Sequence, residues 1–162
     1  MTRFACSAAV AALLAITSPV FAHDGVVHVG PINISGEFSR ATLPRAPVGG
    51  GYMTIENTGA EADRLLSVTS PVSPNVQLHG MNMEGDVMKM RALTEGLEIA
   101  PGETVQLTPG GNHVMFMGIK AAFVEGETVP VTLTFEKAGS VEVELPVLGA
   151  AANAAEADHS SH

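Results

Sequence analysis

The chain has 162 residues and carries 8 Lys and Arg against 17 Asp and Glu, so its formal net charge is −9 at pH 7. This acidity argues against nucleic acid as a partner, because such binding depends on cationic side chains that face phosphates. The single cysteine, Cys6, falls within the first segment described below. The rest of the chain therefore excludes a disulfide framework, a thiolate zinc site, an iron–sulfur cluster and a blue-copper site.

Residues 1–22 have the features of a secretory signal peptide. Arg3 supplies the positive charge, residues 8–16 form an apolar stretch, and Ala22 ends a plausible cleavage site. The stretch is shorter than the roughly 20 residues that a membrane-spanning helix needs, so we expect no stable membrane insertion. We expect a periplasmic protein that starts at His23, with a formal charge of −10 once Arg3 is lost.

Residues 23–148 predict one all-β domain. Short runs rich in Val, Ile, Leu, Thr and Phe recur between Gly, Pro and Asn residues, and no long amphipathic helical pattern is present. Many short strands at this spacing are typical of a β-sandwich or Greek-key barrel. The Ala-rich residues 149–162 have too few bulky apolar side chains to join a core, and we expect a flexible tail. The expected strands lie near 26–38, 51–57, 64–70, 75–80, 87–92, 103–108, 113–120, 128–136 and 140–147.

Histidine and methionine cluster in the middle of this domain. Six of the eight methionines fall between positions 81 and 117, and His79 and His113 lie at either end of this region. Thioether sulfur is a soft ligand, and its combination with imidazole favours copper(I) over zinc, calcium or magnesium. The cluster therefore predicts a copper(I) site.

A hairpin over residues 76–92 would gather part of this site. If it turns at Glu84-Gly85, His79 lies opposite Met90, and Met81 lies opposite Met88. Directly opposed side chains share a face of the sheet and have Cβ atoms about 4.5–5.5 Å apart. The register is open, because glutamate is a poor residue where a tight turn needs positive φ.

A second part of the site is His113-Val114-Met115. Residues two apart in a strand point to the same face, which allows this imidazole and this thioether to converge on one ion. The preceding turn, Pro109-Gly110-Gly111-Asn112, places the pair at the start of a strand and near a rim of the domain. A site at the rim is accessible to a partner that exchanges the metal.

His79, ten residues, Met90 and then His113-x-Met115 resemble the periplasmic copper chaperones of the PCu(A)C family. The resemblance covers roughly 48–147. Two features differ from the family pattern: 22 residues separate Met90 from His113, one more than the usual pattern, and residues 36–41 lack a His-Pro-Trp. The supporting framework includes Gly50-Gly51-Tyr52-Met53-Thr54-Ile55, Asp63-Arg64-Leu65, Met88-Lys89-Met90-Arg91, Pro109-Gly110-Gly111 and Leu133-Thr134-Phe135-Glu136-Lys137-Ala138-Gly139.

The resemblance implies a cupredoxin-like sandwich that binds one copper(I) through the matching residues His79, Met90, His113 and Met115. It also implies delivery of copper towards the dinuclear copper centre of cytochrome c oxidase, with the copper subunit of that enzyme or a Sco-type protein as partner. We expect a monomer and a non-enzymatic carrier.

Several further residues are secondary candidates. Met81, Met83 and Met88 would contact copper transiently or form a partner surface, whereas Met53 and Met117 are interpreted as core residues. His23 with its α-amine, His28, His159 and His162 offer nitrogen donors that suit copper(II), although solvated termini with no defined site are an equal alternative.

Three other functions stay open at this point. One is copper sequestration for tolerance, without a dedicated acceptor. Another is a copper oxygenase built on the N-terminal histidine, although the absence of Trp and the single tyrosine, Tyr52, disfavour a polysaccharide substrate. The last is an interaction domain without a metal.

Overall fold

The computed structural model describes residues 25–153, so the predicted signal segment and residues 154–162 lie outside it. Within the described range every regular element is a strand, and no helix is present that could cross a membrane. The single-domain, all-β prediction is confirmed. The strands are β1 (Val26–Val29), β2 (Ile32–Arg40), β3 (Val48–Asn57), β4 (Asp63–Thr69), β5 (Asn75–Glu84), β6 (Val87–Ala92), β7 (Leu97–Ile99), β8 (Thr104–Leu107), β9 (His113–Met117), β10 (Thr128–Phe135) and β11 (Gly139–Leu148).

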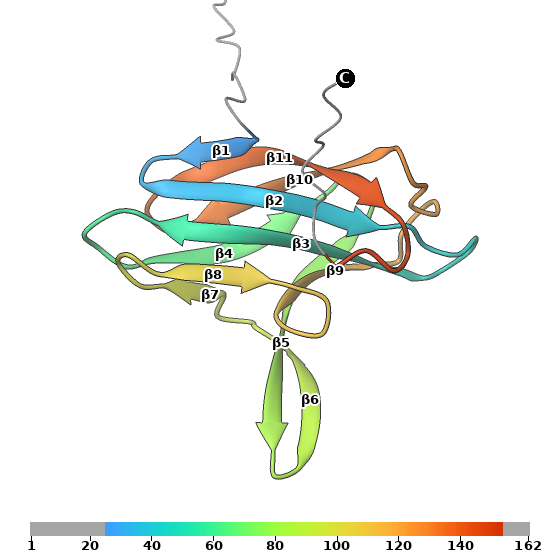
Figure 1. Ribbon diagram of the computed structural model, residues 1–162, viewed down its shortest axis with the longest axis horizontal. Coiled ribbons are helices and arrows are strands. Elements are labelled where there is room, and N and C mark those ends of the chain that lie inside the picture. The colour runs from blue at the N-terminus through green and yellow to red at the C-terminus, as the bar shows by residue number, and fades with distance from the viewer. Residues whose placement is uncertain (1–24, 154–162) are drawn as a thin grey trace, which may run out of the picture.

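The strands form one hydrogen-bonded path in the order β6-β5-β9-β3-β2-β11-β10-β4-β7, with β1 added to β2 and β8 added to β3. Most pairs are antiparallel, but the end of β11 runs parallel to β2. The path is open at β6 and β7, so the architecture is a folded-over sandwich and not a closed barrel (Figure 1). The β5–β6 hairpin extends away from the rest of the molecule in this view.

One apolar core joins the two layers. Alternate residues of β2 and β3, such as Ile34 and Ile55, are fully buried, and so are Leu133 of β10 and Leu145 of β11. The side chains of β5 and β9 that face this core are Leu78, Val114 and Phe116. Because strand residues alternate between faces, His79, His113 and Met115 are directed to the opposite, outer face of the same sheet.

Several strand boundaries differ from the prediction, most clearly in three places. The expected strand 26–38 is two strands, because the chain turns at Gly30, whose φ is +54°, and Pro31 then lacks an N–H for a ladder. Strand β7 is only three residues long, which is too short for an alternating pattern to reveal it. Strand β5 continues past residue 80 to Glu84. The strands expected at 128–136 and 140–147 are present as the antiparallel pair β10 and β11, with Leu133 paired to Val141.

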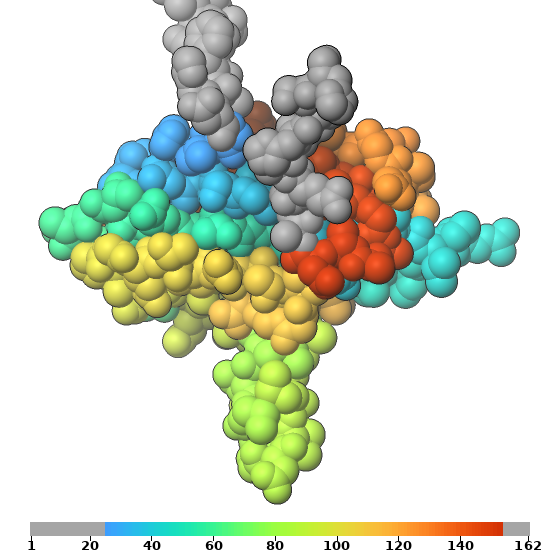
Figure 2. Space-filling view, viewed as in Figure 1, coloured from blue at the N-terminus to red at the C-terminus, as the bar shows by residue number. Residues whose placement is uncertain are grey.

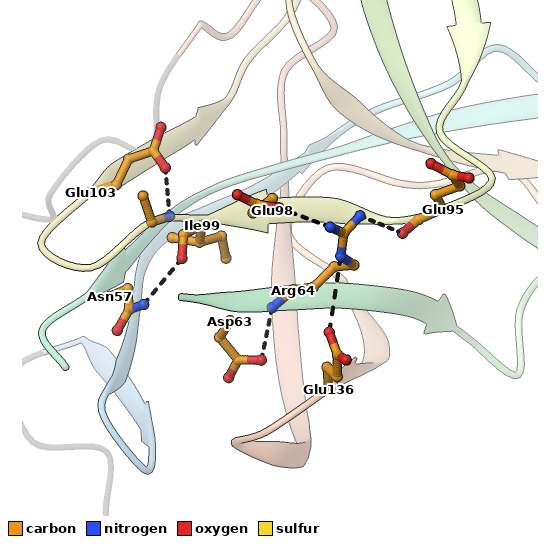
Figure 3. Close-up of polar contacts among 9 residues, drawn as sticks. Asn57, Asp63, Arg64, Glu95, Glu98, Ile99, Glu103 and Glu136 are labelled. Carbon is orange, nitrogen blue, oxygen red and sulfur yellow. Dashed lines mark hydrogen bonds and ion pairs between the residues drawn. The ribbon is translucent and has the colours of Figure 1, made fainter. Parts of the chain in front are cut away.

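Polar side chains connect β4, β7 and the end of β3 (Figure 3). Asn57 is fully buried and donates its amide hydrogens to the carbonyl oxygens of Glu61 and Ile99. Arg64 donates to the carbonyl of Glu95 and to the Glu98 carboxylate. Arg64 thus bridges β4 to β7 and to the turn that precedes β7.

Candidate metal site

The candidate ligands gather on the outer face of three adjacent strands, β6, β5 and β9. His79 of β5 lies directly opposite His113 of β9, and Gln77 lies opposite Met115. Met115 in turn lies opposite Gly50 of β3. The sheet order therefore brings together the two halves of the site, which are 34 positions apart between His79 and His113 in the chain.

The predicted register of the β5–β6 hairpin is wrong by two residues. His79 pairs with Ala92, and Met90 pairs with Met81. The two-residue turn is Gly85-Asp86, so Gly85, with φ of +64°, occupies the position that requires positive φ. Since the shift is even, the methionines of β5 and β6 still project from the predicted face.

The two imidazoles form a close pair. Their ring centroids are 5.7 Å apart with an interplanar angle of 53°. His113 is 8% exposed, and its Nδ1 lies 2.9 Å from the carbonyl oxygen of Gly111. A carbonyl oxygen only accepts hydrogen bonds, so Nδ1 of neutral His113 carries the proton, and its Nε2 keeps a lone pair for a metal.

His79 also has an available lone pair. Its Nε2 lies 2.9 Å from the amide oxygen of Gln77, which makes Nε2 the proton donor. Its Nδ1 is buried and has no hydrogen-bond partner in the protein. A buried nitrogen without a partner is costly, and a metal ion would satisfy it.

Burial lowers the pKa of His79 from its ordinary value of 6.5, and the charge of nearby His113 lowers it further. Both effects favour the neutral imidazole. Because a metal binds only the deprotonated nitrogen, this environment prepares His79 as a ligand near neutral pH.

A cavity of about 350 Å³ opens beside the histidine pair. Its wall includes His113, Met115, Met90 and Met81, together with Pro109 and Gly110 of the preceding turn. His79 lies outside this lining, next to His113. The cavity wall thus holds three of the four primary candidates, His113, Met115 and Met90, together with Met81.

Gly50 leaves room for the cavity wall opposite Met115. A Cβ at this position would collide with the Tyr52 ring, whose Cζ would lie 2.9 Å away. Tyr52 packs against Phe38, with 4.9 Å between ring centroids, and the Arg40 guanidinium lies 5.6 Å from the Tyr52 centroid. Arg40, Gly50 and Tyr52 all line the cavity.

Arg40 also connects the cavity to the C-terminal segment. Its Nε donates to the carbonyl of Ala152 at 2.6 Å, and one terminal nitrogen donates to the Asn153 side chain at 2.8 Å. Residues 149–153 therefore pass close to one wall of the cavity.

The remaining sequence candidates fall into three groups. Met83 and Met88 are opposed on the methionine face, one pair farther out than Met81 and Met90. His28 is exposed on β1, separated from β9 by β2 and β3, and its Nδ1 lies 2.6 Å from the side-chain oxygen of Asn33. His23, His159 and His162 lie outside the described residues.

Within residues 25–153 no three His, Cys, Asp or Glu side chains are grouped as a metal site. The donor set on the outer face is instead imidazole and thioether, which is the set that copper(I) prefers. Sequence reasoning missed Gln77, Gly50, Tyr52 and Arg40 at this site. Gln77 was detectable in principle, since it precedes His79 by two residues on the same face.

Comparison with known proteins links this chain to one family. The family model described as "LpqE-like: Putative lipoprotein LpqE-like" matches residues 32–147. The protein named "Putative lipoprotein Lxx21020" from Leifsonia xyli subsp. xyli is 33% identical over 93 residues, which cover 57% of this chain and 56% of that protein. The chain therefore matches little more than half the length of this relative.

Solved structures of similar fold are PCuAC domains and a related copper protein. The apo PCuAC domain of PmoF2 is 29% identical, with a TM-score of 0.66, covering 79% of this chain and 98% of that one. Its copper-bound form is 29% identical, with a TM-score of 0.65 and coverage of 76% and 97%. Copper(I)-bound DR1885 from Deinococcus radiodurans is 26% identical, with a TM-score of 0.59 and coverage of 78% and 83%.

Proposed function

The chain belongs to the LpqE-like family and has the fold of the PCuAC domains, and on that basis we propose that it is a copper chaperone that binds and donates copper(I). The observation that carries this proposal is the meeting of His79, His113, Met115 and Met90 on one open face. Copper-bound relatives of the same fold support it.

The proposed site has the properties of a carrier. Two neutral imidazoles and two neutral thioethers leave bound copper(I) with a net charge of about +1. Met90 is 48% exposed and lies on the edge strand β6, so an incoming ligand can replace its sulfur without unfolding the core. Stepwise ligand exchange at such an edge is how we propose that the ion is transferred.

We place this activity in the periplasm, with the copper subunit of cytochrome c oxidase or a Sco-type protein as acceptor. The predicted signal segment supports export, and the family resemblance supports the acceptor. Copper sequestration is the second candidate. A deletion strain that is copper-sensitive but assembles normal oxidase would favour sequestration, whereas loss of oxidase assembly that is restored by added copper would favour delivery.

We propose that the protein is a carrier without enzymatic activity. The alternative of an N-terminal copper oxygenase requires His23, which lies outside the described residues. It predicts oxygen consumption by the copper-loaded protein in the presence of a reductant. We expect none above the rate of free copper, and consumption abolished by a His23 substitution would contradict the carrier proposal.

Anaerobic competition with a chromophoric copper(I) chelator tests the proposed binding. We expect one tight equivalent in the wild type and its loss in His113→Ala/Met115→Ala. Met117→Leu is the matched control. Met117 is not a core residue as predicted, but lies half-buried on the outer face of β9, at the other end from His113 and opposite Asn75. Tight binding that survives the double substitution would refute the site.

A further inference from the structure

The methionine face of the β5–β6 hairpin continues beyond the cavity. Met81 and Met90 are directly opposed and line the cavity, and the next pair outward is Met83 and Met88. These residues lie on the hairpin that projects from the body of the molecule (Figure 2). The face thus presents two successive pairs of thioethers.

Packing does not account for the outer pair. Met83 is 61% exposed and Met88 is 52% exposed. All six residues of β6 are exposed, and β6 is the edge strand of the sheet. Apolar side chains stabilise a fold by leaving water, and these two side chains largely remain in it.

The charges of the hairpin are on its other face. Glu84 pairs with Lys89, at 2.6 Å between Nζ and Oε2, and also with Arg91. Because Lys89 and Arg91 alternate with Met88 and Met90, their cationic groups point away from the methionine sulfurs. Cross-strand ion pairs connect the two strands and leave the methionine face uncharged.

We propose that Met83 and Met88 form a second binding site for a soft monovalent ion, copper(I) or its redox-inert analogue silver(I). Opposed residues place their Cβ atoms about 4.5–5.5 Å apart. The three rotatable bonds of each methionine then allow both sulfurs to reach one ion between them. Thioethers are soft and neutral, so the pair selects soft monovalent ions over zinc or calcium.

This outer site is weaker than the cavity site. It offers two thioethers and no imidazole, and its ligands are exposed to water. It also does not depend on the cavity site, because it shares none of the ligands His79, Met90, His113 and Met115. The two sites can therefore be tested separately.

The test is a silver(I) titration of the purified protein, followed by NMR of methionines labelled with ¹³C in the methyl group. We expect the first equivalent to shift the Met90 and Met115 methyls, and further silver(I) to shift Met83 and Met88. In Met83→Leu/Met88→Leu, which keeps the apolar surface but removes both sulfurs, the second step weakens by at least about tenfold while the first is unchanged. Met117→Leu serves as control and keeps both steps.

The outcomes separate this proposal from the carrier proposal. If the Met83 and Met88 methyls do not shift, or if the leucine variant keeps the second step, the outer site does not exist, and the face is at most an apolar contact surface. If these methyls still respond in His113→Ala/Met115→Ala, the outer site is independent as proposed. Failure of Met90 and Met115 to respond in the wild type would count against the cavity site alone.

Discussion

At the scale of single residues, the site depends on which nitrogen of each histidine is free. Gly111 holds the proton of His113 on Nδ1, and Gln77 holds that of His79 on Nε2. These backbone and side-chain partners set the tautomer of each ring, as outer partners of metal-binding histidines commonly do. Ligand spacing alone does not show which ring nitrogen each partner holds protonated.

The lowered pKa of His79 predicts how the stability of the metal-free protein depends on pH. The unfolded chain binds the proton near pH 6.5, before the folded chain does. Stability is therefore present above about pH 6.5 and is lost as the pH falls towards the lower, folded-state pKa. Thermal unfolding between pH 8 and 5 should show a smaller loss of Tm in His79→Gln than in the wild type.

The control for this experiment is His28→Gln, which changes an exposed histidine of β1. The Tm of this variant should change between pH 8 and 5 by the same amount as the Tm of the wild type. The same pH dependence in His79→Gln and the wild type would show that His79 contributes nothing to it.

At the scale of elements, the close packing of β3 depends on its glycines. A Cβ on buried Gly49 would collide with the Phe123 ring, whose Cζ would lie 3.1 Å away. Phe123 is 4% exposed and packs edge-on against Phe116, with 5.4 Å between centroids. The ring therefore has little room to move.

We expect Gly49→Ala to reduce the free energy of unfolding by about 1–3 kcal/mol, the usual cost of overpacking a core. Chemical denaturation measures this change. Val48→Ala, at the exposed neighbouring position, should change it by no more than about 0.5 kcal/mol. An equally small effect at Gly49 would contradict the packing described here.

The alternation of apolar and polar residues made most strands predictable from the sequence. In β10 and β11 apolar residues occupy every second position, and the structure buries Val131, Leu133, Val143 and Leu145 as this pattern indicates. The hairpin face was also predictable, because alternation fixes faces even when the register is unknown. The register itself was wrong, since it depended on whether Glu84 or Gly85 begins the turn.

At the scale of the whole molecule, the sequence could not reveal the strand order. Nothing local indicates that β9 lies between β5 and β3, yet this order places His79 opposite His113. The prediction that the two half-sites converge was based on ligand chemistry and family resemblance. Arg40 and Tyr52 reach the cavity from β2 and β3 only through the same long-range order.

A buried carboxylate at the start of β4 also connects this strand to the turn between β10 and β11. Asp63 is 4% exposed and accepts backbone hydrogen bonds from Arg64, Lys137 and Ala138 at 2.7–2.9 Å. Burial alone would raise its pKa, but these hydrogen bonds and the charge of Lys137 together hold the pKa below its ordinary value of 3.8. The stability that Asp63 supplies is therefore present above about pH 4 and is lost as the pH falls further.

Asp63→Ala should lower the free energy of unfolding at pH 7 by about 1–3 kcal/mol or more, because it leaves buried N–H groups without acceptors. Asp86→Ala, in the exposed hairpin turn, is the control and should change the free energy of unfolding little. Urea denaturation at pH 7 and pH 3 measures both. The cost of Asp63→Ala should shrink at the lower pH, and an equal cost at both would contradict the assigned pKa direction.

The proposed site binds one copper(I) through two imidazoles and two thioethers, from His79, His113, Met90 and Met115. X-ray absorption spectroscopy of the protein loaded with one equivalent of copper(I) tests it most directly. We expect a mixed shell of nitrogen and sulfur scatterers, with the sulfur contribution reduced in Met115→Ala. A shell of nitrogen or oxygen alone, or one that is unchanged in this variant, would contradict it.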